Sequence, residues 1–407
     1  MKYVIVGASA AGLNAAKTLR SLDANVDITL VSKDNRIHSR CIMHHYLKDK
    51  RTLEQLNFVG PDFIADSRIN WKKGVAVTKV DTNKKELTLS VGDPVPYDKL
   101  LIAAGSSSAF PATIKNLSEA KSGVSGFRNI EDAIAIKKLA ADPAVKNIVV
   151  LGAGLVSIDA IEGLLKFGKK LSLVELTTHM LSKQLDPHAA SAYERAFIQA
   201  GVKQFYGTKV NELVLNEEGG VKQVELESGV RIPCDLFIVA SGVSPNVSFL
   251  EGSGIIVNEK GLAFDHFGKT NVEHVFGAGD ISGRSSIWSA AVKQGIIAAY
   301  NMVGKPLEQT DFFVSKSTMN FLNIATMSLG SPEPPDDSYS VEIDIDDKGN
   351  YKKIIHKGGE IIGAIVQGDL SYAGILTQLI REKIDVSKVE KPLFKIDYSD
   401  FFGAFVF

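Results

Sequence analysis

The sequence predicts an α/β protein in which two similar β–α–β units are followed by a smaller α+β segment. Two observations predict the paired units: an apolar strand runs into a glycine-rich turn at residues 4–12, and the same pattern returns at 148–157. The third observation is a change near residue 310, after which short alternating apolar and polar segments replace the β–α–β pattern. The 407 residues are enough for two or three domains.

The composition is that of an ordinary globular protein, with 45% hydrophobic and 23% charged residues. A net charge of -1 without a long basic run argues against nucleic acid as a partner. No apolar stretch approaches the roughly 20 residues that span a bilayer. The first strand begins too early to leave room for a signal peptide. We therefore expect a cytoplasmic protein with no membrane partner.

The first unit begins with a strand at 2–6, a helix at 12–22 and a second strand at 27–32. Alternating residues near 74–80 and 86–90 predict a small antiparallel excursion. The run 100–105 is apolar throughout and ends at a glycine, as expected of a buried parallel strand.

The second unit repeats this order and then gives way to a return to the first. Its expected helices lie at 130–139, 154–167 and 187–200, and its expected strands at 147–151, 170–175, 210–215, 221–226 and 236–242. A further strand with a glycine turn at 275–280 and a helix at 287–303 resemble parts of the first unit. We therefore expect one discontinuous domain at 1–112 and 245–310, interrupted by a second domain at 113–244.

The last part, 311–407, is expected to be an α+β domain. Strands at 341–345, 351–357 and 361–366, a hairpin turn at 347–350 and a helix at 372–383 are predicted. The aromatic tail at 401–407 has three open alternatives: packing on its own core, sealing a dimer, or covering a cofactor.

A glycine turn between a strand and a helix binds a pyrophosphate through backbone N–H groups and the helix dipole. The second turn offers Gly152, Gly154, Leu155 and Val156 for this purpose. Glu175 ends the next strand, where a carboxylate accepts hydrogen bonds from a ribose 2′-hydroxyl and repels a 2′-phosphate. No arginine follows in residues 176–180, so NADH is expected rather than NADPH.

Five motifs in order resemble the pyridine nucleotide-disulfide oxidoreductase superfamily: the two glycine turns and the segments 97–105, 240–246 and 277–280. The resemblance implies two interleaved Rossmann-like dinucleotide-binding domains of three-layer ββα architecture, with FAD at the first turn and NADH at the second. It implies the following FAD-binding positions: Gly7, Ser9, Ala10, Ala11, Gly12, Ser32, Lys33, Arg40, Val77, Ala104, Gly105, Gly242, Gly279 and Asp280.

Three of these positions carry information about individual roles. Asp280 resembles the acidic residue that holds the ribityl chain of the flavin, although a turn or capping aspartate is the simpler alternative. Ser32 stands where the family usually has an acidic residue that binds the adenosine ribose, and Asp34 lies two residues later. Glu162 resembles a position near the nicotinamide, but exposed helical glutamates are usually only solvated.

Cys41 is the candidate catalytic residue. Its segment lacks the cysteine pair of glutathione-reductase-type enzymes and resembles the single-cysteine branch: NADH oxidases, NADH peroxidases and coenzyme A disulfide reductases. Such a cysteine needs a stabilised thiolate, for which Arg40, His44 and His45 are expected to supply positive charge. The alternative is a half-buried structural cysteine. Ala10 replaces a histidine of the oxidases and peroxidases, which argues against a peroxidase.

The C-terminal segments 351–355, 361–369 and 383–387 resemble the small domain of rubredoxin reductases. We therefore expect an NADH-oxidising flavoprotein that reduces a disulfide or oxygen through Cys41. The alternative is direct electron delivery to a small redox protein such as rubredoxin, and a different class of function is a flavin-binding redox sensor. No metal site is predicted, Cys234 is expected in the core, and a homodimer is left open.

Overall fold

The computed structural model describes residues 1–284, 286–310 and 316–401. The chain divides into two compact units, which we describe separately. The first unit comprises residues 1–109, 128–135 and 242–312, and the second comprises 110–127, 136–241 and 313–407.

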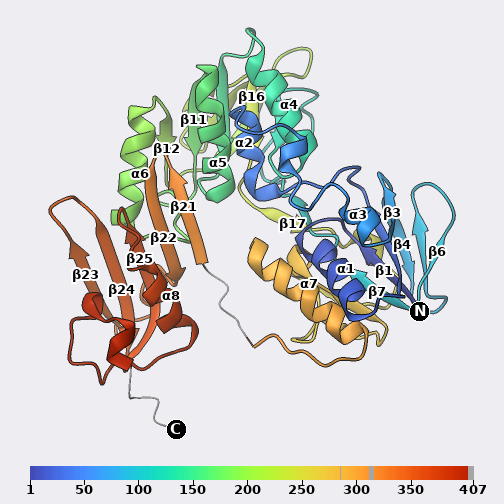
Figure 1. The fold of residues 1–407 in the computed structure, drawn as a ribbon. Coiled ribbons are helices and arrows are strands. Elements are labelled where there is room, and N and C mark those ends of the chain that lie inside the picture. The colour runs from blue at the N-terminus through green and yellow to red at the C-terminus, as the bar shows by residue number, and fades with distance from the viewer. Residues whose placement is uncertain (285, 311–315, 402–407) are drawn as a thin grey trace. The chain divides into compact units, whose positions relative to one another are not determined.

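The first unit is built on a five-stranded parallel sheet of order β20-β7-β1-β2-β3 (Figure 1). Its strands are β1 (Lys2–Val6), β2 (Asp27–Ser32), β3 (Ile69–Lys73), β7 (Lys99–Ile102) and β20 (Val275–Gly277). In this register Val4 lies between Thr29 and Leu100. Strands β1, β2, β7 and β20 are nearly continuous runs of buried residues because both faces of the sheet are covered there, whereas only Ile69 is buried in the edge strand β3.

Helices cover one face of this sheet and a second sheet covers the other. Helices α1 (Ala10–Leu22) and α7 (Trp288–Met302) share an apolar core with Ile5, Leu101 and Phe276. The antiparallel strands β4 (Val77–Asp81), β5 (Glu86–Leu89) and β6 (Val95–Pro96) share another core with Val4 and Leu100. The three-layer ββα arrangement expected from the sequence is therefore confirmed in this unit.

The shorter elements of the first unit lie in its connections. They are η1 (Arg40–Ile42), α2 (Met43–Leu47), η2 (Glu54–Leu56), α3 (Phe63–Asp66), β8 (Ser106–Ser108), β17 (Val243–Pro245), η4 (Ser248–Leu250), β18 (Val257–Asn258), β19 (Gly261–Leu262) and η5 (Gly279–Ser282).

The second unit contains another parallel sheet, of order β12-β11-β10-β16-β9. Its strands are β9 (Val124–Gly126), β10 (Asn147–Leu151), β11 (Lys170–Val174), β12 (Lys203–Phe205) and β16 (Leu236–Val239). An antiparallel sheet packs against it through a shared apolar core and consists of β13 (Val210–Leu215), β14 (Val221–Leu226) and β15 (Arg231–Pro233). The helices of this unit are α5 (Leu155–Leu164), the short η3 (Leu165–Phe167) and α6 (Pro187–Gln199), and α4 (Ile130–Ala141) begins in the first unit and ends in the second.

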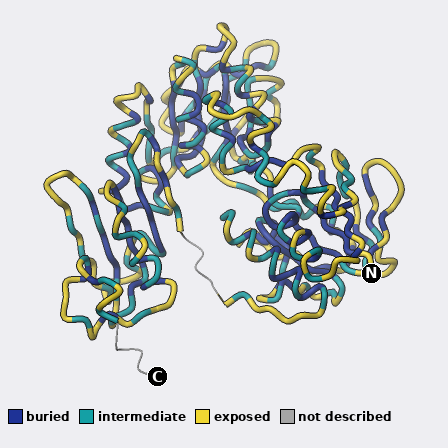
Figure 2. The backbone as a smooth tube through the Cα atoms, in the orientation of Figure 1, coloured by how far each residue is buried: buried dark blue, intermediate teal, exposed yellow. Residues whose placement is uncertain are grey.

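The C-terminal part of the second unit is a five-stranded antiparallel sheet of order β21-β22-β25-β24-β23. Its strands are β21 (Lys316–Phe321), β22 (Ile324–Gly330), β23 (Ser340–Ile345), β24 (Tyr351–Lys357) and β25 (Glu360–Gln367). Helix α8 (Ala373–Arg381) packs on one face, and η6 (Leu393–Lys395) and η7 (Tyr398–Phe401) follow. Figure 2 shows that the buried residues follow the strands of these sheets.

The expected fold class is confirmed, with small differences at element ends. The helix expected at 154–167 ends as an α-helix at Leu164 and continues as one 3₁₀ turn. Strands β21 and β22 were not expected from the sequence, although in β22 the polar residues Thr326 and Ser328 alternate with Met327 and Leu329. Of the aromatic tail, only Phe401 lies within the described residues.

Candidate functional site

The first glycine turn joins β1 to α1 and is closed by contacts that admit no side chain. Gly7 has φ +115°, and a Cβ there would lie 2.1 Å from the backbone oxygen of Ala103. A Cβ on Gly12 would lie 1.9 Å from the oxygen of Gly7. Because both distances are far below van der Waals contact, glycine is required at both positions. The backbone therefore turns tightly at the end of β1.

A cavity of about 650 Å³ opens at this turn, at the carboxyl ends of the parallel strands. Its volume is within the range of roughly 300–1,000 Å³ that is typical of ligand sites. The first turn of α1 has no acidic residue, and its N-cap Ser9 makes no side-chain cap bond. The N–H groups and positive dipole end of α1 are therefore available to an anion. This arrangement fits the pyrophosphate of FAD.

Most of the predicted FAD positions line this one cavity, and so does Cys41. The lining predicted positions are Gly7, Ser9, Ala10, Ala11, Ser32, Lys33, Arg40, Cys41, Val77, Ala104, Gly105, Gly279 and Asp280. Gly12 and Gly242 are not among the lining residues. Gly12 packs against the turn itself, and the Gly242 carbonyl accepts a hydrogen bond from the Ala109 N–H.

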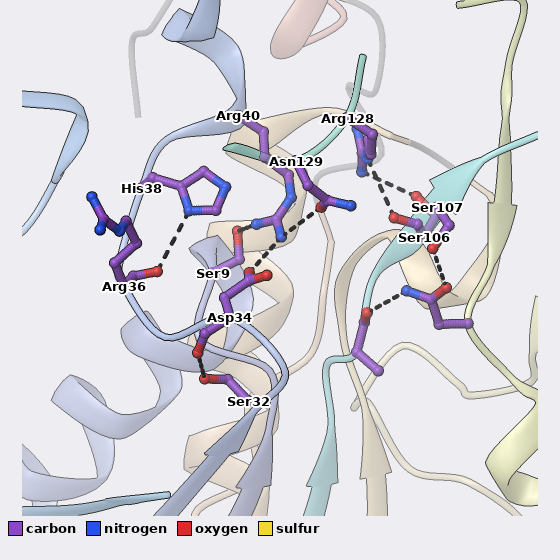
Figure 3. A network of polar contacts seen from close by, with 12 residues as sticks. Ser9, Ser32, Asp34, Arg36, His38, Arg40, Ser106, Ser107, Arg128 and Asn129 are labelled. Carbon is purple, nitrogen blue, oxygen red and sulfur yellow. Dashed lines mark hydrogen bonds and ion pairs between the residues drawn. The ribbon is translucent and has the colours of Figure 1, made fainter. Parts of the chain in front are cut away.

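Arg40 lies beside the glycine turn and connects three parts of the first unit (Figure 3). Its Nη1 donates to Ser9 Oγ at 3.0 Å, and its Nη2 forms an ion pair with Asp34 Oδ2 at 2.7 Å. The same Nη2 donates to Asn129 Oδ1 at 3.2 Å. Both side chains of the ion pair are 18% exposed, so a positive group is fixed at the turn while its charge is partly balanced by Asp34.

Ser32 is already engaged within the protein. Its hydroxyl donates to the backbone oxygen of Asp34 at 2.7 Å and accepts a hydrogen bond from Trp71 Nε1 at 2.9 Å. A hydroxyl has one donor and two acceptor positions, so Ser32 retains one acceptor position for a ribose hydroxyl.

Asp280 and its surroundings form the other polar part of the cavity. Its carboxylate is ion-paired with Arg128, whose Nη2 also donates to Ser106 Oγ at 3.0 Å. The Gly279 N–H donates to Gln294 Oε1 at 2.8 Å, which fixes the turn that carries Asp280. Nearby, Asn246 Nδ2 donates to the oxygen of Ala104 at 2.9 Å.

Arg128 and Asn129 are cavity residues that the sequence analysis missed. They lie between β9 and α4, far along the chain from the glycine turn. Arg128 is a single basic residue before a helix, and such a residue forms no recognisable sequence motif. It reaches the cavity only because the chain folds, and there it donates to Ser106 Oγ.

Cys41 lies in η1, is exposed and lines the cavity. One of the expected sources of positive charge differs from the expectation: burial, with smaller contributions from His45, Lys48 and Lys50, lowers the pKa of His44 to about 3. His44 is therefore neutral at neutral pH. Cys234 is buried as expected, and burial raises its pKa to about 12, which makes it unreactive.

The second glycine turn joins β10 to α5 in the second unit. Gly152 has φ +103°, and a Cβ there would lie 2.9 Å from the Ala240 oxygen, whereas a Cβ on Gly154 meets no atom within 4 Å. The first turn of α5, which begins at Leu155 and Val156, has no acidic residue. Glu175 Oε2 accepts from the Ala153 N–H at 2.6 Å, and Oε1 accepts from the Thr177 N–H at 2.8 Å. The carboxylate thus lies against the turn, with acceptor positions left on both oxygens.

Within residues 1–284, 286–310 and 316–401, no group of three or more His, Cys, Asp or Glu side chains could hold a metal ion. No helix in the described part of the chain is long and apolar enough to cross a membrane.

Comparison with known proteins places the chain in a family. Residues 1–295 match the pyridine nucleotide-disulphide oxidoreductase family, and residues 316–384 match the rubredoxin NAD+ reductase C-terminal domain. The epsilon subunit of NADH-dependent phenylglyoxylate dehydrogenase from Aromatoleum evansii is 30% identical, over 95% of this chain and 93% of the relative. The NAD(P)H nitrite reductase of Bacillus subtilis is 25% identical, over 96% of this chain but only 48% of the relative.

A solved structure shares the fold of the whole chain. The NAD-dependent persulfide reductase from A. fulgidus superimposes with a TM-score of 0.86 at 22% identity, covering 97% of this chain and 79% of the other. The family match spans more than half of the 407 residues. The chain belongs to the pyridine nucleotide-disulphide oxidoreductase family and is an NAD(P)H-dependent flavoprotein oxidoreductase.

Proposed function

We propose that this flavoprotein takes electrons from NADH and delivers them to a disulfide or to oxygen at Cys41. The observation that carries the proposal is that Cys41 is exposed and lines the same cavity as the first glycine turn and Asp280. FAD, when bound, supplies the chemistry of accepting a hydride and passing its electrons on. The protein supplies binding, orientation and the acceptor site.

The residues of the first unit have distinct proposed roles in holding FAD. The N-terminus of α1 and Arg40 neutralise the pyrophosphate. Asp280 binds hydroxyl groups of the ribityl chain through the carboxylate oxygen that Arg128 does not hold. Ser32 accepts a hydrogen bond from the adenosine ribose in place of the usual acidic residue.

In the second unit, the proposed NADH-binding residues are Gly152, Gly154, Leu155, Val156 and Glu175. The uncapped start of α5 receives the pyrophosphate, and the open space at Gly154 lets a ligand approach the backbone. The Glu175 carboxylate accepts hydrogen bonds from the ribose hydroxyls and repels a 2′-phosphate, so NADH is preferred to NADPH.

We further propose the domain boundaries and the location of the protein, and we leave its oligomeric state open. The FAD-binding domain comprises 1–112 and 245–310, the NADH-binding domain 113–244 and the C-terminal domain 311–407. The protein acts in the cytoplasm. A homodimer is the alternative to a monomer.

Replacement of Cys41 by serine tests the acceptor part of the proposal. Reduction of the flavin by NADH is expected to be unchanged, because the thiol acts only after that step. Turnover with a low-molecular-weight disulfide or with oxygen is expected to fall by at least about tenfold. Unchanged turnover with both acceptors would show that Cys41 is a structural residue.

A second candidate function is direct electron delivery to a small redox protein. It is favoured by the match of residues 316–384 to the rubredoxin NAD+ reductase C-terminal domain. It is also favoured by the similarity to a subunit of a larger NADH-dependent dehydrogenase. Rubredoxin reduction by both the wild type and the Cys41→Ser variant would support this function. In the remaining alternative, a flavin-binding redox sensor, NADH binding changes the assembly of the protein and turnover is incidental.

A further inference from the structure

One face of the C-terminal sheet carries a group of polar side chains that are buried: Thr326, Ser328, Tyr351, Lys353 and Gln367. In the antiparallel register, Thr326, Gln367 and Tyr351 form one row across strands β22, β25 and β24. The neighbouring row, two residues away on each strand, consists of Ser328, Ile365 and Lys353. Side chains two residues apart on a strand share a face, so these two rows project together. The opposite face carries Met327, Leu329, Ile354, Ala364 and Val366, which pack with α8. Buried polar groups are costly unless they are paired, so a polar face of this kind has specific partners.

The partners are α6 and the residues just before it, which belong to the same compact unit (Figure 1). Tyr351 Oη donates to Asp186 Oδ2 at 2.6 Å, and Lys353 Nζ forms an ion pair with the same oxygen at 3.0 Å. The Lys353 and Asp186 side chains are only 5% and 6% exposed. Burial by itself raises the pKa of Asp186. Hydrogen bonds from Tyr351, the Ala189 N–H and Lys353, together with the Lys353 charge, outweigh this effect and lower the pKa, so the carboxylate stays ionised.

Further bonds extend this contact along α6 and into the preceding loop. Gln367 Nε2 donates to the Ala189 oxygen at 3.0 Å, and Tyr193 Oη donates to Thr326 Oγ1 at 2.8 Å. Ser328 Oγ donates to the backbone oxygen of Gln184, two residues before the N-cap of α6. The sheet therefore holds both the start of α6 and the end of the loop before it.

That loop, residues 176–185, runs from Glu175 to Asp186 and closes against the second glycine turn. The Leu181 N–H donates to the oxygen of Ala153 at 2.9 Å, while the Glu175 carboxylate accepts the Ala153 N–H. Leu181 is buried and has φ +56°, a conformation that a leucine rarely adopts. Such a residue keeps its conformation only when its surroundings impose it.

We propose that Tyr351 and Lys353 are positioning residues for the dinucleotide at the second turn. By fixing Asp186 they hold the far end of the 176–185 loop, and the loop in turn holds Ala153 between Glu175 and Leu181. The C-terminal sheet thereby helps to set the shape of the nucleotide site. This inference rests on the proposed binding of NADH at Gly152–Gly154 and Glu175.

The test uses the FAD-loaded full chain with two variants and a matched control. Tyr351→Phe removes only the hydroxyl bond to Asp186. Lys353→Met removes the ion pair with Asp186 and also the contacts of Lys353 Nζ with Glu333 Oε2 and the Pro332 oxygen, both at 2.9 Å. Lys352→Met is the control, because Lys352 is the next residue on β24, points to the opposite face and pairs with the partly exposed Asp344. The measurements are the dissociation constant of NAD+ by calorimetry, the KM and kcat for NADH, and amide hydrogen exchange.

We expect Tyr351→Phe and Lys353→Met to weaken NAD+ binding on the order of tenfold and to raise the KM for NADH more than they change kcat. Exchange of the Leu181 and Ala153 amides is expected to accelerate, while the amides of β10 stay protected as in the wild type. The control variant is expected to match the wild type in each measurement.

The outcomes separate the inference from the proposed function. If the wild type binds NAD+ and the two variants bind it as tightly as Lys352→Met, the inference is wrong and the proposed function stands. If variants lose protection in β10 as well as in the loop, the bonds stabilise the whole unit and the positioning role is refuted. If the wild type itself binds no NAD+, the proposed nucleotide site fails and the inference fails with it.

Discussion

Helices α1 and α7 approach each other so closely at one point that no side chain fits between them. Gly295 of α7 lies against Ala11 of α1, and a Cβ on Gly295 would be 2.2 Å from the Ala11 backbone oxygen. This distance falls about 1.2 Å short of a 3.4 Å van der Waals contact, and the atom in the way is backbone. Gly295→Ala therefore forces the two helices apart by roughly 1 Å.

The displacement has consequences for stability and for FAD. Overpacking of this kind costs about 1–3 kcal/mol of the free energy of unfolding. Ala11 and Ala291, on the two helices, both line the cavity, so their separation also changes the shape of the proposed FAD site. We expect the affinity for FAD to fall on the order of tenfold.

The assay combines urea unfolding of the holoprotein with titration of FAD into the deflavinated protein. Gly374→Ala is the matched control: Gly374 lies in helix α8, and a Cβ there meets no atom within 4 Å. This control is expected to leave FAD binding unchanged and to stabilise the protein by up to about 1 kcal/mol, because alanine favours helix. A Gly295→Ala variant as stable as the wild type and with the same FAD affinity would refute the reasoning.

Three further predictions follow from the sites. Glu175→Ala is expected to lower the preference for NADH over NADPH by at least about tenfold, measured as the ratio of kcat/KM values, and an unchanged ratio would remove Glu175 from the site. Asp280→Asn is expected to weaken FAD binding by about 1–3 kcal/mol in a flavin titration, whereas wild-type affinity would leave Asp280 with only a structural role. Burial, with a smaller effect of Arg40, lowers the pKa of His38 from 6.5 to about 4. The unfolded chain then binds more protons in this window, so the contribution of His38 to the free energy of unfolding is expected to fall by roughly 1–3 kcal/mol as the pH drops from 6.5 to 4, measured by urea unfolding. His44, whose pKa is also lowered, acts in the same direction in the wild type and in a His38 variant alike. A His38→Gln variant should show a flatter pH dependence, and an identical slope would contradict the assignment.

The sequence predicted correctly the features that depend on short local patterns, namely the glycine turns and the buried parallel strands. Gly7 and Gly152 follow apolar strands, and their positive φ angles are the reason that glycine stands there. The run at 100–105 predicted a buried parallel strand, which is observed as Lys99–Ile102, because both faces of that strand are apolar. The glycine turns could therefore be predicted from the sequence alone.

Other features depend on contacts between distant residues and leave no local pattern. Arg128 reaches Asp280 across 152 positions in the chain. The neutral state of His44 follows from its burial, which the surrounding histidine and lysine residues do not reveal. The burial of the polar rows of the C-terminal sheet leaves no local pattern in the sequence, because it depends on their pairing with Asp186 and α6.

The central claim is that the FAD held at the first turn receives electrons from NADH held at the second. Anaerobic titration of the yellow FAD-loaded protein with NADH tests this claim most directly. The account predicts that the yellow absorbance is lost as NADH is added, with an end point of one NADH per bound FAD, and that NADPH requires a much higher concentration. A protein that binds FAD but keeps its yellow colour in excess NADH would contradict the account.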